Sequence, residues 1–144
     1  MSRIASLLLS GVLLLSLSAC SSLFYPRAAD YANQAKGATE LDTVINLTTM
    51  MEASAKAARN GKGKDAPLDD LHNQFHAMDN HICCLTDEQK AKPAYDLAVT
   101  QNKELWKIFM RVWKFKDDQP QRADHLDLFA KHVQDLRATL QSLK

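Results

Sequence analysis

The sequence is poor in the residues that build catalytic loops and tight turns. Its 144 residues include four glycines, four prolines and three cysteines. It contains no Gly-x-Ser-x-Gly elbow, no glycine-rich phosphate loop and no Cys-x-x-Cys redox pair. The scattered serine, histidine and aspartate residues cannot be assembled into a catalytic triad from their spacing. We therefore expect the protein not to be an enzyme.

Two further patterns are missing. No segment alternates polar and apolar residues over several positions, which is the pattern of a half-buried strand. The formal net charge is only +1, whereas nucleic-acid-binding proteins carry clustered positive charge. The sequence thus favours an all-helical protein and argues against nucleic acid as its partner.

One long apolar run does occur, at the N-terminus. After Arg3, the apolar residues from Ile4 to Leu17 are interrupted only by serine, alanine and glycine. A basic start, a short apolar core and small residues at its end are the three parts of a secretory signal. The run is shorter than the roughly 20 apolar residues that span a membrane. We predict that residues 1–19 are an export signal and not a retained membrane helix.

The end of this run, Leu17-Ser18-Ala19-Cys20, resembles the lipobox of bacterial lipoproteins. In that family the signal is cut before the cysteine, whose thiol receives a diacylglycerol and whose new amine is acylated. Several acyl chains anchor a protein to a membrane in effect permanently. The resemblance therefore implies that Cys20 is the lipid attachment site and the first residue of the mature protein.

The residues after the cysteine bear on the choice of membrane. In the lipoprotein family an aspartate at that point favours the inner membrane, and here Ser21 and Ser22 follow instead. The resemblance implies a lipid-anchored protein on the periplasmic face of the cell outer membrane. The inner membrane is the less favoured alternative.

Beyond the signal, the sequence predicts a tether and lead-in over residues 20–38 and one helical domain over residues 39–144. Apolar residues at helical spacing indicate four helices. They cover 39–59, 68–84, a segment from Thr86 through Lys116 with a kink or break at Pro93, and a last segment that begins near Pro120. Short connections favour antiparallel neighbours, so we expect an all-α, up-down four-helix bundle.

Two of these helices carry narrow apolar seams with strict steps of three and four residues. The seams consist of Leu68, Leu71, Phe75, Met78, Ile82 and Leu85, and of Leu126, Phe129, Val133, Leu136, Leu140 and Leu143. Seams of this width are typical of coiled-coil-like packing. They also allow a helical hairpin that completes its core by dimerisation, which is the alternative architecture.

Cys83 and Cys84 are the two cysteines that remain, and they are neighbours in the sequence. Adjacent α-carbons lie about 3.8 Å apart, less than the roughly 4.4–6.8 Å of an ordinary disulfide. An ordinary disulfide between them is therefore excluded. Burial as reduced thiols, a bond across a dimer, metal binding and a strained vicinal bond stay open, with burial of at least one thiol as the first expectation.

A polar stripe follows one side of the second predicted helix and consists of Asp69, His72, His76, Asp79 and Cys83. Two histidines one helical turn apart can chelate a borderline or soft cation, and an acid or thiol one turn away can complete the site. His72, His76, Asp79 and Cys83 are thus candidate ligands for Zn²⁺, Cu²⁺ or Ni²⁺. The alternative interpretation is a solvated helix face that needs no metal.

Residues Leu85-Thr86-Asp87-Glu88-Gln89 match the LTxxQ motif of small helical periplasmic stress- and metal-response proteins. Some metal-sensing members carry paired histidines shortly before the motif, as His72 and His76 stand here. The similarity covers residues 72–89 only, and the second copy that many members have is absent. The same residues are also explained by a helix end followed by a capping box.

The third predicted helix carries a basic stripe of Lys103, Lys107, Arg111 and Lys114 beside Trp106, Trp113 and Phe115. Near an anionic lipid surface each such charge contributes about 1 kcal/mol to binding. An ordinary solvated face with the aromatic residues in the core explains the stripe more simply, because acids elsewhere cancel the charge.

Together these features favour a membrane-anchored periplasmic lipoprotein that acts by binding a protein partner of the cell envelope, as an accessory or assembly factor or as an inhibitor of the immunity type. The alternative is a metal-binding or stress-responsive, chaperone-like periplasmic protein that uses His72 and His76. Pairing with a second copy of the chain is compatible with both. Apart from the metal of the alternative, no cofactor is expected beyond the acyl chains on Cys20.

We predict that Cys20→Ser leaves an uncut, unlipidated precursor, because serine offers no thiol to accept the diacylglycerol. Mass spectrometry of the protein from membrane fractions measures both the cleavage point and the added acyl mass. Cys84→Ser is the matched control and should be processed as the natural chain is. Normal cleavage and membrane association of Cys20→Ser would contradict the lipoprotein prediction.

Overall fold

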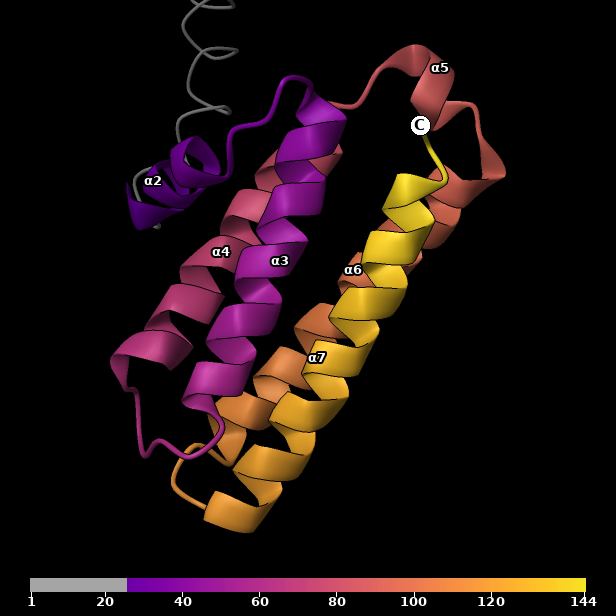
Figure 1. The fold of residues 1–144 in the computed structure, drawn as a ribbon. Coiled ribbons are helices and arrows are strands. Elements are labelled where there is room, and N and C mark those ends of the chain that lie inside the picture. Colours follow the sequence, from indigo (N-terminus) through magenta and orange to yellow (C-terminus); the bar gives the residue numbers. More distant parts are fainter. Residues whose placement is uncertain (1–25) are drawn as a thin grey trace, which may run out of the picture.

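The computed structural model of the protein describes residues 26–144, so the predicted signal (residues 1–19) and Cys20 lie outside the described residues. The described part is all-helical and contains no strand (Figure 1). Its helices are α2 (Pro26–Ala35), α3 (Glu40–Ala58), α4 (Ala66–Ile82), α5 (Asp87–Lys90), α6 (Pro93–Lys114) and α7 (Gln119–Gln141). No helix in this range is both long and apolar enough to cross a membrane.

The four long helices form the predicted up-down bundle (Figure 1). One hairpin consists of α3 and α4, the other of α6 and α7, and the hairpins meet chiefly where α3 packs against α7. The α3–α4 and α6–α7 turns lie at the same end of the bundle, while α5 and the C-terminus lie at the other (Figure 1). A single chain supplies all four helices, as in the first of the two predicted architectures.

The helix starts follow from local capping. Thr39 accepts a hydrogen bond from the backbone N–H of Asp42 at the start of α3 and is the N-cap of that helix. Thr86 and Gln89 form the predicted capping box at α5. The third predicted helix is indeed broken, because α5 ends at Lys90 and α6 begins anew at Pro93, whose ring fits the first turn of a helix.

The predicted apolar seams are confirmed. All six members of each seam, on α4 with Leu85 and on α7 with Leu143, are buried. On α6 the apolar residue Leu97 does not join the core and is 52% exposed. The buried stripe of α6 instead follows Ala98, Asn102 and Leu105, and the position next to Ala98 points about 100° away from that stripe.

The segment predicted as tether and lead-in, residues 20–38, contains a helix that packs on the bundle. Helix α2 packs against α3 and α4 and buries Ala28, Tyr31, Ala32 and Ala35. Arg27 forms ion pairs with Asp69 at 2.7 Å and with Asp70 at 3.1 Å. The Tyr31 hydroxyl donates to Asp70, and burial together with this carboxylate raises the pKa of Tyr31 to about 12. Residues 26–35 therefore belong to the folded body.

Polar side chains reinforce the contact between α3 and α7. Arg137 on α7 donates hydrogen bonds to the carboxylate of Glu52 at 2.6 Å and to the carbonyl oxygen of Thr48 at 3.0 Å. Gln134 donates to the same carboxylate at 2.8 Å. Hydrogen bonds from Lys56, Gln134 and Arg137 lower the pKa of Glu52 to about 2, so this carboxylate is ionised at neutral pH.

Arg122, in the first turns of α7, is fully buried at the end of the bundle that holds the α3–α4 and α6–α7 turns. Its guanidinium donates to the carbonyl oxygens of Ala58 at 2.8 Å, Gly63 at 2.8 Å and Lys116 at 3.1 Å. It also forms an ion pair of 2.6 Å with Asp65, the N-cap of α4. One side chain thus joins the end of α3, the α3–α4 turn and the end of the other hairpin.

We predict that Arg122→Ala lowers the free energy of unfolding by about 3–5 kcal/mol, because it leaves a carboxylate and several carbonyl oxygens without their donor. Urea unfolding followed by circular dichroism measures the loss. The matched control is Arg59→Ala, which removes the exposed ion pair with Asp127 and should cost at most about 1 kcal/mol. Equal losses in the two variants would contradict the role assigned to Arg122.

Candidate functional site

Helices α4 and α6 face each other across large side chains instead of packing closely. We call this set the aromatic layer, and it consists of His72, Phe75 and His76 from α4 and Trp106, Phe109 and Trp113 from α6. The rings of Phe75 and Trp106 lie 4.9 Å apart between centroids, and those of His72 and Phe109 are nearly parallel at 5.4 Å. These contacts are typical of aromatic pairs in protein cores. The aromatic layer therefore sets the spacing of the two hairpins along this edge.

The two histidines of the predicted stripe meet in this layer. The Nε2 atoms of His72 and His76 are 3.2 Å apart. Burial lowers the pKa of His72, and burial together with the neighbouring His72 lowers the pKa of His76 to about 4. Both imidazoles are therefore neutral at pH 7, which is the state in which a ring nitrogen can accept a proton or bind a metal ion.

The rest of the predicted metal set does not join them. Asp79 accepts a hydrogen bond from the side-chain N–H of Asn102 at 3.2 Å. Cys83 lies beyond the end of α4 at Ile82, with its Sγ atom 3.6 Å from that of Cys84. Within residues 26–144, no group of three or more histidine, cysteine or acidic side chains is placed to hold a metal ion. The helix spacing thus brings the two histidines together, while Asp79 is hydrogen-bonded to Asn102 and Cys83 lies beyond the helix end.

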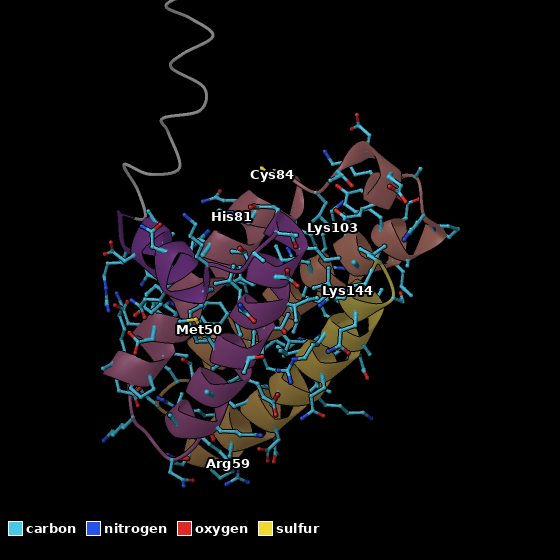
Figure 2. The ribbon with its side chains drawn as sticks, turned by 45° about the horizontal axis from the view of Figure 1, so that its top comes forward. Met50, Arg59, His81, Cys84, Lys103 and Lys144 are labelled. Atoms are coloured by element: carbon cyan, nitrogen blue, oxygen red, sulfur yellow. The ribbon has the colours of Figure 1, made fainter. Side chains whose placement is uncertain are left out.

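Cys83 and Cys84 are both exposed free thiols, so the expectation that at least one of them is buried was wrong. The cause is the end of α4 at Ile82, which carries the buried seam. The following turn places both cysteines outside the core, near the Asn80 carbonyl oxygen. Cys84 and His81 lie at the end of the bundle away from Arg59 (Figure 2).

A pocket of about 400 Å³ opens between α4 and α6 next to the histidines. We call it the α4/α6 pocket. From α4 it is lined by Phe75, His76 and Asp79, and from α6 by Asn102, Lys103, Trp106 and Lys107. A volume of a few hundred Å³ with mostly apolar walls and a few polar groups is typical of ligand sites.

Asn102 is the least expected member of this pocket, because it is only 3% exposed and occupies a core position of α6. Its N–H₂ group must face Asp79, since a carboxylate can only accept. The Oδ1 atom of Asn102 then has no hydrogen-bond donor among the described residues. A buried acceptor without a donor costs about 1–3 kcal/mol, and because this atom has almost no accessible surface it lies in the packing between the helices and is not open to the pocket.

The predicted basic stripe is exposed along α6, and the structure divides it into two parts. Lys103 and Lys107 line the α4/α6 pocket, whereas Lys114 lies over the ring of Phe115. Lys107 pairs with Glu104 at 2.6 Å. In the described part of the chain Lys103 has no acidic partner within ion-pair distance. The pocket is thus bordered by the ammonium groups of Lys103 and Lys107 and by the carboxylate of Asp79.

A second hollow, of about 360 Å³, lies where α2 leads into α3 and is lined mainly by small and polar residues. It contains the pair formed by His81 and Glu40, whose Nδ1 and Oε1 atoms are 2.5 Å apart. These two side chains satisfy each other, and the hollow has no aromatic wall. The α4/α6 pocket is therefore the stronger candidate site.

Comparisons with protein-family models, with curated proteins and with solved structures find no match for this chain.

Proposed function

We propose that the protein is a lipid-anchored accessory protein of the cell envelope that binds another protein through the face formed by α4 and α6. The observation that carries the proposal is the α4/α6 pocket, an open hollow with aromatic walls and two lysines at its border. Tryptophan at the wall of a pocket is typical of the residues that dominate protein interfaces.

The sequence supports a location in the cell envelope. The Leu17-Ser18-Ala19-Cys20 motif and the apolar run before it favour export and lipidation at Cys20. A lipid anchor holds the bundle near a membrane surface, where its partners would also be membrane proteins or proteins that act beside them. The outer membrane, with the bundle on its periplasmic side, is the proposed location.

The proposal predicts contacts that depend on the face of the bundle. A photo-crosslinking amino acid placed at Lys107, beside the pocket, should give a discrete adduct with one protein in living cells of the native host. The same amino acid at Asp135, on the exposed side of α7, is the matched control and should give none. The partner is then identified by mass spectrometry, purified, and titrated with the natural chain and with Trp106→Ala.

Saturable binding to the natural chain that weakens at least about tenfold in Trp106→Ala supports the proposal. The proposal would be contradicted by equal crosslinked adducts from Lys107 and Asp135. Equal binding of the partner by the natural chain and by Trp106→Ala would contradict it as well.

A second candidate function is metal binding by His72 and His76. Two nitrogens bound at about 2.0–2.1 Å to one metal ion lie roughly 3.0–3.4 Å apart, depending on the bond angle. The 3.2 Å between the two Nε2 atoms falls in this range, and the lowered pKa of each histidine keeps it neutral at pH 7. With two protein ligands, such a site takes its remaining ligands from solvent or a partner.

Titration of the protein with Zn²⁺, Cu²⁺ and Ni²⁺ tests this candidate, with calorimetry and thermal unfolding as readouts. We expect micromolar binding and a raised unfolding temperature in the natural chain, and neither in the double variant His72→Ala, His76→Ala. His132→Ala, on α7, is the matched control and should bind as the natural chain does. No binding by the natural chain would remove the metal function and leave the protein-binding proposal standing.

A further inference from the structure

Helix α4 ends in a turn that carries two exposed thiols. Cys83 is the C-cap of the helix, and Cys84 follows it. In a continuing helix the backbone N–H of Cys84 would donate to the carbonyl oxygen of Asn80. It donates instead to the carbonyl oxygen of His81 at 2.9 Å. The Asn80 carbonyl is thus one of the last carbonyls of α4, for which a helix itself supplies no donor.

Both thiols turn toward this one oxygen. The thiols of Cys83 and Cys84 donate to the Asn80 carbonyl oxygen, with Sγ–O distances of 3.3 and 3.5 Å. The two Sγ atoms lie 3.6 Å from each other. Two sulfurs and one backbone oxygen therefore form a nearly equilateral triangle, which we call the thiol–carbonyl site.

The dimensions of the thiol–carbonyl site match those of donors around one metal ion. Sulfur ligands lie about 2.3 Å from a tetrahedral Zn²⁺ and oxygen ligands about 2.1 Å from it. At the tetrahedral angle, two such sulfurs are about 3.8 Å apart, and a sulfur and an oxygen about 3.6 Å apart. The observed separations are only slightly shorter. The turn thus holds the three donors close to the positions that they would take around an ion.

The helix end and the chemistry of sulfur both favour a cation here. The C-terminal end of a helix carries partial negative charge on its last carbonyl oxygens. Thiolate sulfur is preferred by soft and borderline cations, whereas Mg²⁺ and Ca²⁺ prefer oxygen. Both thiols are exposed, and Cys84 lies at the surface of this end of the bundle (Figure 2). An ion can therefore reach them from solvent without a change in the core.

We propose that the thiol–carbonyl site binds one soft or borderline divalent cation of the Zn²⁺ and Cd²⁺ class. Cys83 and Cys84 supply two thiolates, the Asn80 carbonyl oxygen is the third ligand, and solvent supplies the fourth. Binding breaks the two S–H bonds and releases both protons to solvent. The site shares no residue with the α4/α6 pocket or with the pair of His72 and His76. The inference therefore goes beyond the proposed function and does not rest on it.

The test titrates the full chain with Cd²⁺ in mild detergent, with its thiols kept reduced. Bonds from Cd²⁺ to thiolates absorb in the ultraviolet and bonds to imidazole nitrogens do not, so this absorbance reports a thiolate site alone. We expect it to saturate at one ion per chain and to be reversed by excess Zn²⁺. Ca²⁺ should leave it unchanged, because Ca²⁺ takes oxygen ligands.

Variants of the protein identify the ligands. Cys83→Ser and Cys84→Ser should each weaken Cd²⁺ binding at least about tenfold, because one thiolate remains where two were. Asn80→Ala is the matched control, since it keeps the carbonyl oxygen, and should change the affinity less than about twofold. The double variant His72→Ala, His76→Ala should keep the full thiolate absorbance. Asn80, Cys83 and Cys84 are exposed, so variants at these positions are expected to fold, which circular dichroism checks.

A peptide of residues 80–85 with blocked ends carries the same donors without the helix. It should bind Cd²⁺ at least about tenfold more weakly than the protein, because its donors must be ordered on binding. Equal binding by this peptide would overturn the inference, since two neighbouring cysteines would then be enough without the fold.

Three further results would overturn the inference. The first is the absence of thiolate absorbance in the natural chain, and the second is unchanged affinity in either cysteine variant. The third is a ratio of one ion to two chains, or a disulfide-linked dimer through Cys83 or Cys84 in protein isolated without reductant. That result would assign the two thiols to a contact between copies of the chain.

Discussion

The relative placement of the two hairpins depends on one buried cation. Arg122 brings a full positive charge to a site with no solvent exposure, where an unpaired charge would be very costly. Its cost is offset because Asp65 and three backbone carbonyl oxygens surround the guanidinium. These acceptors belong to the end of α3, the α3–α4 turn with the N-cap of α4, and the α6–α7 turn. The charge is therefore satisfied only when both hairpins stand in their native register.

The two long edges where the hairpins meet are built differently. Along α3 and α7, Glu52 and Arg137 connect closely packed helices. Along α4 and α6, the aromatic layer keeps the helices apart and leaves an open pocket with Asn102 at its wall. A bundle whose only task was to be stable would gain by closing this second edge with smaller residues and an apolar side chain in place of Asn102.

Periodicity made the fold and the histidine pair predictable, because steps of three and four residues place side chains on one face of a helix wherever that helix packs. The same reasoning could not find Arg122, whose partners are carbonyl oxygens of turns that are distant in the sequence. Asn102 did leave a signal, as a polar residue between Ala98 and Leu105 on the buried side of α6, but its missing donor depends on Asp79 of another helix. The exposure of Cys83 and Cys84 depended on where α4 ends, and single-residue helix ends are not encoded by periodicity.

The arrangement of α3 and α7 has a mechanical consequence. Glu52 and Arg137 join these two helices along one edge of the bundle. Helices α4 and α6 form the opposite edge, where the aromatic layer separates them. Arg122 connects the turns of the two hairpins at one end of the bundle, and the hydrogen bond from Asn102 to Asp79 connects α6 to α4 nearer the end that carries α5 (Figure 1). These polar contacts thus fix the separation of α4 and α6 at two points along the edge that the aromatic layer spaces.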